Sequence, residues 1–223
     1  MWGFSLFVIV ALAMGLLWRL LIFNFYFQII KVDIGFLNRF EEKVQNELLR
    51  LCTSRGMLSG ALLATDDVTG HWDVLAPEYV ADAIGQIADY PTVSVAWAGY
   101  LGLAVAHGWD TNWEVCVRTA YRQYYGEQGF DDMDEHIVQH VLGLSLESKE
   151  AKELEGMIRS CAQMAVTLIR REQIEPQSPM AFHVFARVIK VMYRVGAALE
   201  LKRLGYRLEE VQCPPHLGLS AEC

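Results

Sequence analysis

The sequence has 223 residues, 53% of them apolar, and a formal net charge of −8 at pH 7. This length suits a single domain that buries a substantial core, with or without an appended segment. An acidic chain without a run of Lys and Arg lacks the clustered cations that bind a phosphate backbone. The composition therefore argues against nucleic acid as a partner.

The cysteines are odd in number and widely spaced, and no two of them form a Cys-x-x-Cys pair. They are Cys52, Cys116, Cys161, Cys213 and Cys223. This pattern matches neither a disulfide framework nor a zinc knuckle. We interpret them as free thiols in a reducing compartment, which agrees with a cytoplasmic location for the body of the protein.

The chain opens with an apolar segment, residues 1–30, in which Arg19 is the single charge. Its uncharged stretch from Trp2 to Trp18 would span roughly 25 Å as a helix, close to the ~30 Å hydrocarbon thickness of a bilayer. The tryptophans suit an interfacial aromatic belt, and Lys and Arg follow on the C-terminal side only. A membrane anchor is therefore one interpretation, with contact through residues 2–30 and the body on the cytoplasmic side.

Two other interpretations of this segment stay open. It is a buried core helix if Arg19 marks a true interruption, or the chain starts near Lys31, where the composition becomes that of a soluble domain. Under all three interpretations, residues 31–223 form one acidic helical domain.

The domain shows the 3.6-residue apolar period and the end signals of helices throughout. The expected helices are residues 36–52, 77–89, 91–109, 111–126, 131–143, 148–172 and 179–205. Residues 66–72, "DDVTGHW", are expected to be a loop. Short connections then predict an all-α fold, an antiparallel bundle of about six to seven helices preceded by the N-terminal apolar helix.

The segment 91–109 is the strongest candidate for the centre of that bundle, because it is long, apolar and nearly uncharged. Ala98, Gly102 and Ala106 follow one another at intervals of four residues and form a ridge of small side chains. Such a ridge lets a second helix approach closely. Its Thr, Ser and Gly content favours a core helix over a membrane span.

The motif "GFDDMDEHIVQH", residues 129–140, combines four carboxylates with two histidines. Asp131 or Asp132 suits a helix N-cap, and Asp132 and Glu135 have the spacing of a capping box. Further acids in a first turn are favoured by the helix dipole. Capping therefore accounts for all four acids without a function.

The two histidines, His136 and His140, lie one helical turn apart, a spacing at which two imidazoles can bind one divalent metal ion. Asp132 lies on the same stripe, but it is about 12 Å from His140 along a helix, which is too far for both to bind one ion. Either pair of neighbours makes half a site. Another helix must supply the remaining ligands, and His107 is among the candidates.

A basic stripe follows the last helix, formed by His183, Arg187, Lys190 and Arg194 among apolar neighbours. Buried cations need counter-charges, and the acidic helix at 131–143 is one source. The stripe is then a structural ion-pair network, a solvated edge, or a pocket for a small anion held by His183, Arg187 and Arg194.

Two functional hypotheses follow. The chain contains no nucleophile elbow, phosphate-binding glycine loop or dinucleotide motif. The first hypothesis is a non-enzymatic interaction or regulatory protein with a protein partner, held at the cytoplasmic face of a membrane. The second is a helical enzyme that binds a metal or a small anion through His136 and His140, with Asp132 or Glu135 as general base or as a partner that orients a ligand.

Overall fold

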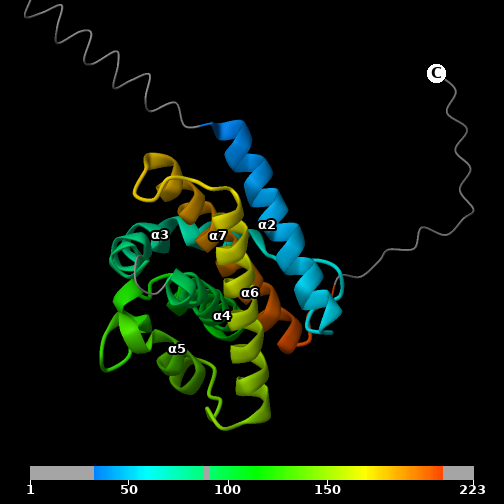
Figure 1. Cartoon of the computed structure of the whole chain (residues 1–223). Coiled ribbons are helices and arrows are strands. Elements are labelled where there is room, and N and C mark those ends of the chain that lie inside the picture. Colours follow the sequence, from blue (N-terminus) through cyan, green and yellow to red (C-terminus); the bar gives the residue numbers. More distant parts are fainter. Residues whose placement is uncertain (1–32, 88–90, 208–223) are drawn as a thin grey trace, which may run out of the picture.

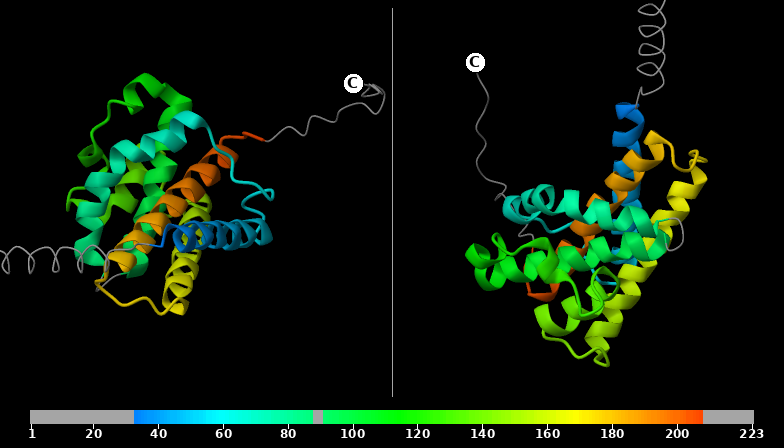
Figure 2. Two further views of the ribbon diagram at one scale, coloured as in Figure 1. Left: turned by 90° about the horizontal axis from the view of Figure 1, so that it is seen from above. Right: turned by 90° about the vertical axis from the view of Figure 1, so that its left-hand side faces the viewer.

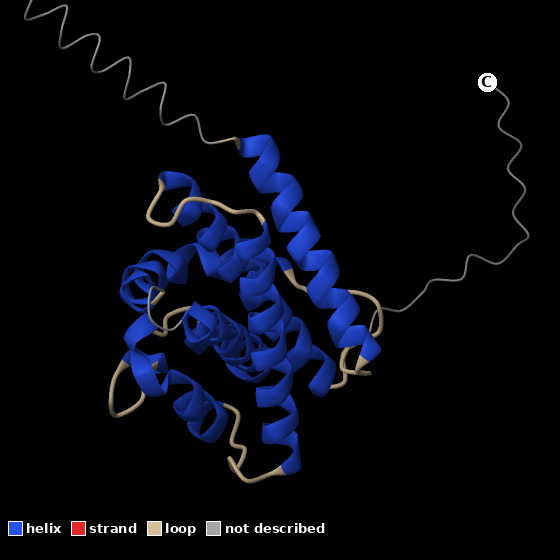
Figure 3. Cartoon of the chain, viewed as in Figure 1, coloured by secondary structure: helices blue, strands red, loops and turns tan. Residues whose placement is uncertain are grey.

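The computed structural model describes residues 33–87 and 91–207, and this part of the chain is helical without a strand (Figures 1 and 3). Its α-helices are α2 (Ile34–Ser54), α3 (Asp66–Gln86), α4 (Pro91–Cys116), α5 (Met133–His136), α6 (Lys149–Arg171) and α7 (Pro179–Arg203). Two 3₁₀ helices, η1 (Tyr121–Tyr124) and η2 (Phe130–Asp132), precede α5, and the π-helix η3 (Ile137–Val141) follows it. The predicted all-α bundle is confirmed.

The centre of the bundle is the crossing of α4 and α7, with α3 and α5 on one side and α2 and α6 on the other (Figures 1 and 2). The backbones touch at this crossing. A Cβ atom on Gly102 would lie 2.0 Å from the carbonyl oxygen of Tyr193, and one on Gly196 would lie 1.9 Å from that of Gly99. The predicted ridge of small residues therefore serves close helix packing in the core.

Two contacts along each pair give the direction of α2 relative to α6 and α7. Lys43, in the middle of α2, pairs with Glu172 at the end of α6 at 2.7 Å, and Cys52 near the end of α2 contacts Cys161 in the middle of α6, so these two helices are antiparallel. Glu41 pairs with Arg187 in the first half of α7, and Ser59 after α2 accepts from Lys202 near the end of α7, so α2 and α7 run in the same direction. The bundle thus departs from a simple up-and-down order.

The loop expected at residues 66–72 is instead the start of α3. The Thr65 side chain caps this helix by accepting a hydrogen bond from the Val68 amide at 3.2 Å, and two carboxylates occupy the first turn. Gly70 points to solvent, so its missing side chain costs no packing. Pro77, expected at a first turn, lies inside the helix. Burial of the apolar face has therefore overridden the local glycine and proline signals.

The helix expected at 111–126 is also wrong. Helix α4 continues to Cys116 through a kink at Asn112, where φ is −164° and ψ is 91°. Asn112, rather than Thr111, accepts the hydrogen bond from the next turn, which the Val115 amide donates at 3.2 Å. The Thr111 hydroxyl donates back to the His107 carbonyl at 2.8 Å. The kink places His107 at the edge of the core.

The other long helices agree with the sequence signals. Ser148 caps α6 and Ser178 caps α7, each accepting an amide hydrogen bond at 3.1 Å, and Pro179 stands in the first turn of α7. Within residues 33–87 and 91–207, none of the helices has the length and apolar character that a membrane span needs. The apolar segment at 1–30, with its anchor interpretation, lies outside the described residues.

Candidate acid–base site around His107

The site is built on Glu200, a carboxylate in the most buried part of α7. Its side chain is 0% exposed and lies between the buried Leu199 and Leu201. A buried carboxylate needs hydrogen-bonded counter-charge. Arg203, one turn later, donates from Nε to Oε2 at 2.6 Å and from Nη2 to Oε1 at 2.7 Å. This two-pronged contact compensates the Glu200 charge within α7 itself.

Arg203 also reaches Glu150 at the start of α6, with Nη1 to Oε1 at 3.1 Å. The hydrogen bonds to Glu200, followed by the charges of both carboxylates, raise the pKa of the Arg203 guanidinium above its usual value, against the opposing effect of burial. The guanidinium is therefore a permanent cation that pairs with both carboxylates. An ionised carboxylate can only accept hydrogen bonds.

The third hydrogen bond to Glu200 comes from His107 on α4, whose Nδ1 lies 2.8 Å from Oε1. Because Glu200 can only accept, Nδ1 carries a proton and donates it to this bond. The other ring nitrogen, Nε2, remains available, and 24% of the imidazole side chain is exposed. A carboxylate that fixes the orientation and tautomer of an imidazole in this way is a recurring arrangement in acid–base sites.

His107 lines a surface cavity of about 330 Å³. The cavity lies between the second half of α4 and the segments that follow it, and its walls also contain Ala104, Gly108, Thr111, Asn112, Val115, Cys116, Thr119, Gln123, Tyr124, His140 and Val141. His107 and His140 reach the same cavity from two different segments. The remaining hydroxyl and amide groups lie among apolar side chains, so the cavity suits a small molecule that has both apolar and polar parts.

Cys116 in the same wall is held away from nucleophilic use. Its thiol contacts the Tyr124 hydroxyl at 3.9 Å and the Val105 carbonyl at 3.8 Å. Burial raises the pKa of the Cys116 thiol, outweighing the Tyr124 contact. A Cβ on Gly108 would lie 2.6 Å from this sulfur, so Gly108 is required for the thiol to pack below His107. The reactive group of the cavity is therefore the imidazole.

The predicted metal ligands are only partly brought together. The rings of His136 and His140 lie 5.1 Å apart, at the junction of α5 and η3. The Asp132 carboxylate turns back and accepts from the Gln128 amide at 3.0 Å. Among the described residues, no group of three or more His, Cys, Asp or Glu side chains is arranged to hold a metal ion. The metal hypothesis therefore keeps a two-imidazole pair, and His107 is engaged with Glu200.

The capping interpretation of the acidic motif is also corrected. Asp132 stands at the N-cap of α5, but its side chain makes no capping hydrogen bond, and the helix expected at 131–143 is divided into η2, α5 and η3. Asp134 is partly buried, and this burial raises its carboxyl pKa although the Trp97 side chain donates to it. Asp134 thus packs against Trp97 of α4, Asp132 binds the Gln128 amide, and the acids do not form one cap.

The residues of the predicted anion pocket have different surroundings. Arg187 is paired with Glu41 on α2, and its counter-charge does not come from the acidic motif. The His183 ring lies against Phe182. Arg194 lines a separate small hollow beside the start of α3, where its Nε has no hydrogen-bond partner in the described structure. Of the three interpretations, the ion-pair network applies at Arg187.

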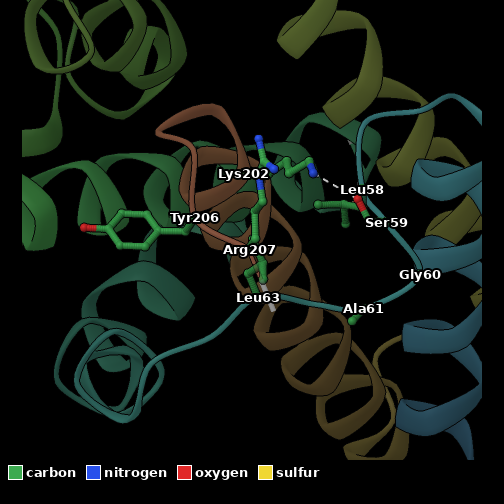
Figure 4. A pocket seen from close by; sticks show the side chains of 8 residues that line it. All are labelled: Leu58, Ser59, Gly60, Ala61, Leu63, Lys202, Tyr206 and Arg207. Atoms are coloured by element: carbon green, nitrogen blue, oxygen red, sulfur yellow. Dashed lines mark hydrogen bonds between the residues drawn. The ribbon is translucent and has the colours of Figure 1, made fainter. Parts of the chain in front are cut away.

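A larger cavity, about 520 Å³, lies between the loop after α2 and the end of α7. Figure 4 shows Lys202 reaching toward Ser59 across it, and the ammonium donates to the Ser59 hydroxyl at 2.9 Å. Tyr206 points away and donates to Asp110. The cavity contains cations but no acid–base pair, and none of the predicted site residues lines it.

Sequence reasoning missed Glu200 and Arg203, although a signal was present. Glu200 is the only acid in an apolar run that extends from Val195 to Leu201. A lone acid at such a position must find a counter-charge, and Arg203 follows at helical spacing. The sequence did not indicate that His107, far away in the chain, would be the second partner.

Comparisons with protein-family models, with curated proteins and with solved structures each gave no match to this chain.

Proposed function

We propose that the protein is an acid–base enzyme that acts on a small molecule bound in the His107 cavity. The observation that carries the proposal is the fully buried Glu200 carboxylate, which orients an imidazole on the wall of a cavity. A buried charge that orients a single side chain is a frequent property of catalytic sites.

In this proposal, Nε2 of His107 accepts a proton from a hydroxyl, an amine or a water molecule in the cavity. The imidazolium that forms is stabilised by Glu200 at 2.8 Å, and Arg203 keeps that carboxylate in place. His140, also on the cavity wall, donates a hydrogen bond to the substrate as it gains negative charge. The sequence hypothesis of a small-ligand enzyme is retained, with His107 in place of His136.

The test replaces His107 by Asn. The Asn amide nitrogen takes the place of Nδ1, so the hydrogen bond to Glu200 is kept and Nε2 is lost. The probe is p-nitrophenyl acetate, a small ester whose hydrolysis needs only a base or nucleophile.

We expect His107→Asn to remove the ester hydrolysis of the wild type while it keeps the folded stability. His183→Asn is the matched control, because it removes an imidazole elsewhere on the bundle, and it should hydrolyse the ester like the wild type. Equal rates of ester hydrolysis in wild type and His107→Asn would reject the proposal. A loss of hydrolysis that is explained by unfolding of the variant would also reject it.

A second candidate is the interaction protein expected from the sequence, with residues 1–30 as its membrane anchor. It is favoured by an exposed apolar stripe on α3, in which Val74 is 66% and Ile84 is 44% exposed. Pro77 and Ala81 lie between them on the same face. Such a stripe is typical of a helix that packs against a partner protein.

This candidate predicts that Val74→Asp with Ile84→Asp abolishes a complex formed by the full chain in cross-linked cell extracts, with ester hydrolysis unchanged. If the same cross-linked species persist in the double variant, α3 is not the docking face.

A further inference from the structure

Two thiols from different helices meet in the core. Cys52 near the end of α2 and Cys161 in the middle of α6 are both 0% exposed, and their sulfur atoms lie 3.6 Å apart. They are separated by 109 residues in the sequence. Both are free thiols in this structure.

The helices that carry the pair are held on both sides of it. The ion pair between Lys43 and Glu172 joins α2 to α6 on one side. On the other side, the Arg55 guanidinium donates to the Ser160 hydroxyl at 3.0 Å. A disulfide has a sulfur–sulfur length near 2.05 Å, so the two sulfur atoms need to approach by only about 1.5 Å.

The two thiols share one sulfur–sulfur contact and one neighbouring cation. The Arg55 charge favours the thiolate form of either cysteine and so lowers the pKa of both, whereas burial raises the pKa of both. Arg55 follows Cys52 by three residues at the end of α2, and we take Cys52 as the thiol that attacks first and Cys161 as the one that resolves.

A surface cavity lies close to the pair, although neither sulfur lines it. This cavity, of about 470 Å³, lies between the end of α2 and α6 and is lined by residues that include Arg55, Met57, Gly156 and Met157. The Met57 amide donates to the Cys52 carbonyl at 2.9 Å, so the cavity wall is continuous with the backbone of Cys52. Met157 lies one turn before Cys161 on the same face of α6. No atom fills the space beside Gly156.

We propose that Cys52 and Cys161 form a peroxide-reactive dithiol that closes into a disulfide between α2 and α6. The Cys52 thiolate attacks one oxygen of hydrogen peroxide, the O–O bond breaks, and hydroxide leaves, which gives a sulfenic acid. The Cys161 sulfur then attacks the Cys52 sulfur, and the hydroxyl group departs as water with the Cys161 proton. The two thiols together lose two electrons. The peroxide gains these electrons and is reduced to two molecules of water.

Cys116 provides an internal comparison. It is also a buried thiol, but its sulfur neighbours are a hydroxyl and a carbonyl, and no second thiol contacts it in the described structure. Cys116 therefore has no neighbouring thiol among the described residues with which to form a disulfide. The proposal is independent of the acid–base function, because neither Cys52 nor Cys161 lines the His107 cavity.

The experiment exposes the full chain to hydrogen peroxide, blocks the remaining thiols with N-ethylmaleimide, and maps the peptides by mass spectrometry. We expect a cross-linked peptide that joins Cys52 to Cys161, two hydrogens lighter than the reduced pair. The cross-link should also raise the thermal midpoint of unfolding, because it closes a loop of 109 residues. Cys116→Ser should give the same cross-link.

Two variants test the order of the steps. In Cys161→Ser the sulfenic acid on Cys52 has no resolving thiol and should be trapped by dimedone, whereas Cys52→Ser should give neither product. If a buried serine prevents folding, Cys161→Ala and Cys52→Ala serve the same purpose. The proposal is overturned if both thiols remain alkylatable after peroxide that fully oxidises N-acetylcysteine in the same solution. Pairing of Cys52 with Cys213 or Cys223 would overturn it equally.

Discussion

Replacing Glu200 by Gln tests the buried site most directly. Glu200 accepts three hydrogen bonds, one from His107 and two from Arg203. The Gln amide keeps one acceptor oxygen, but its NH₂ group faces a donor of Arg203 or of His107. The variant therefore loses the carboxylate charge and places donor against donor in a fully buried position.

The size of the loss follows from these contacts. Hydrogen bonds to charged groups contribute roughly 1.5–3 kcal/mol each, and breaking one side of a buried ion pair costs about 3–5 kcal/mol. Arg203 keeps Glu150 and is partly exposed, which limits the penalty on its side. We therefore expect Glu200→Gln to reduce the free energy of unfolding by about 3–5 kcal/mol.

Urea denaturation followed by circular dichroism measures this change, with an unaltered m-value as the check that the same structure unfolds. His107→Asn is the matched control, since it keeps a donor to Glu200 and should cost at most about 1 kcal/mol. A loss below about 1 kcal/mol in Glu200→Gln would contradict this expectation, because it would show that the three hydrogen bonds to Glu200 do not depend on a carboxylate.

The remaining predictions concern packing and protonation. Gly102→Ala places a Cβ 2.0 Å from the Tyr193 carbonyl and should cost about 3 kcal/mol in urea denaturation, whereas Gly156→Ala meets no atom and should stabilise by about 0.5–1 kcal/mol. Burial lowers the pKa of His71, so the stability that its neutral ring contributes is present above about pH 6.5 and declines as the pH falls. His71→Leu should reduce this acid sensitivity in thermal melts between pH 7.5 and about pH 5; an unchanged pH profile would contradict it. Burial raises the pKa of Asp134, so its ionisation opposes folding as the pH rises, and Asp134→Asn should raise the thermal midpoint at neutral pH but not in acid, where the wild type is protonated.

Some of the fold could be predicted from residues within one or two turns of each other. The serine caps of α6 and α7 and the apolar period of α2 are signals of this kind, and their helices appear where expected. The small residues of α4 also predicted its close contact with another helix, although they did not identify α7 as that helix.

The wrong predictions at residues 66–72 and at Asp132 have a common physical cause. At residues 66–72 the glycine and the two acids resembled a loop. Val68 and Trp72 bury their side chains there, and this burial extends α3 through the segment. At Asp132 the spacing resembled a capping box, but the carboxylate accepts a hydrogen bond from the Gln128 amide instead. Local preferences amount to about 1 kcal/mol or less, so one buried side chain outweighs them.

The candidate site was even less accessible to sequence reasoning. His107 was singled out as a metal ligand, and His140 with it, yet the group that determines the chemistry of His107 is Glu200, 93 residues away. Composition and neighbouring residues were enough to predict the helical class, the helix ends at capping serines and the acidic character of the body. Which charges are buried together depends on the fold, because the energy of a buried charge depends on the partners that the crossing of α4 and α7 brings within hydrogen-bonding distance.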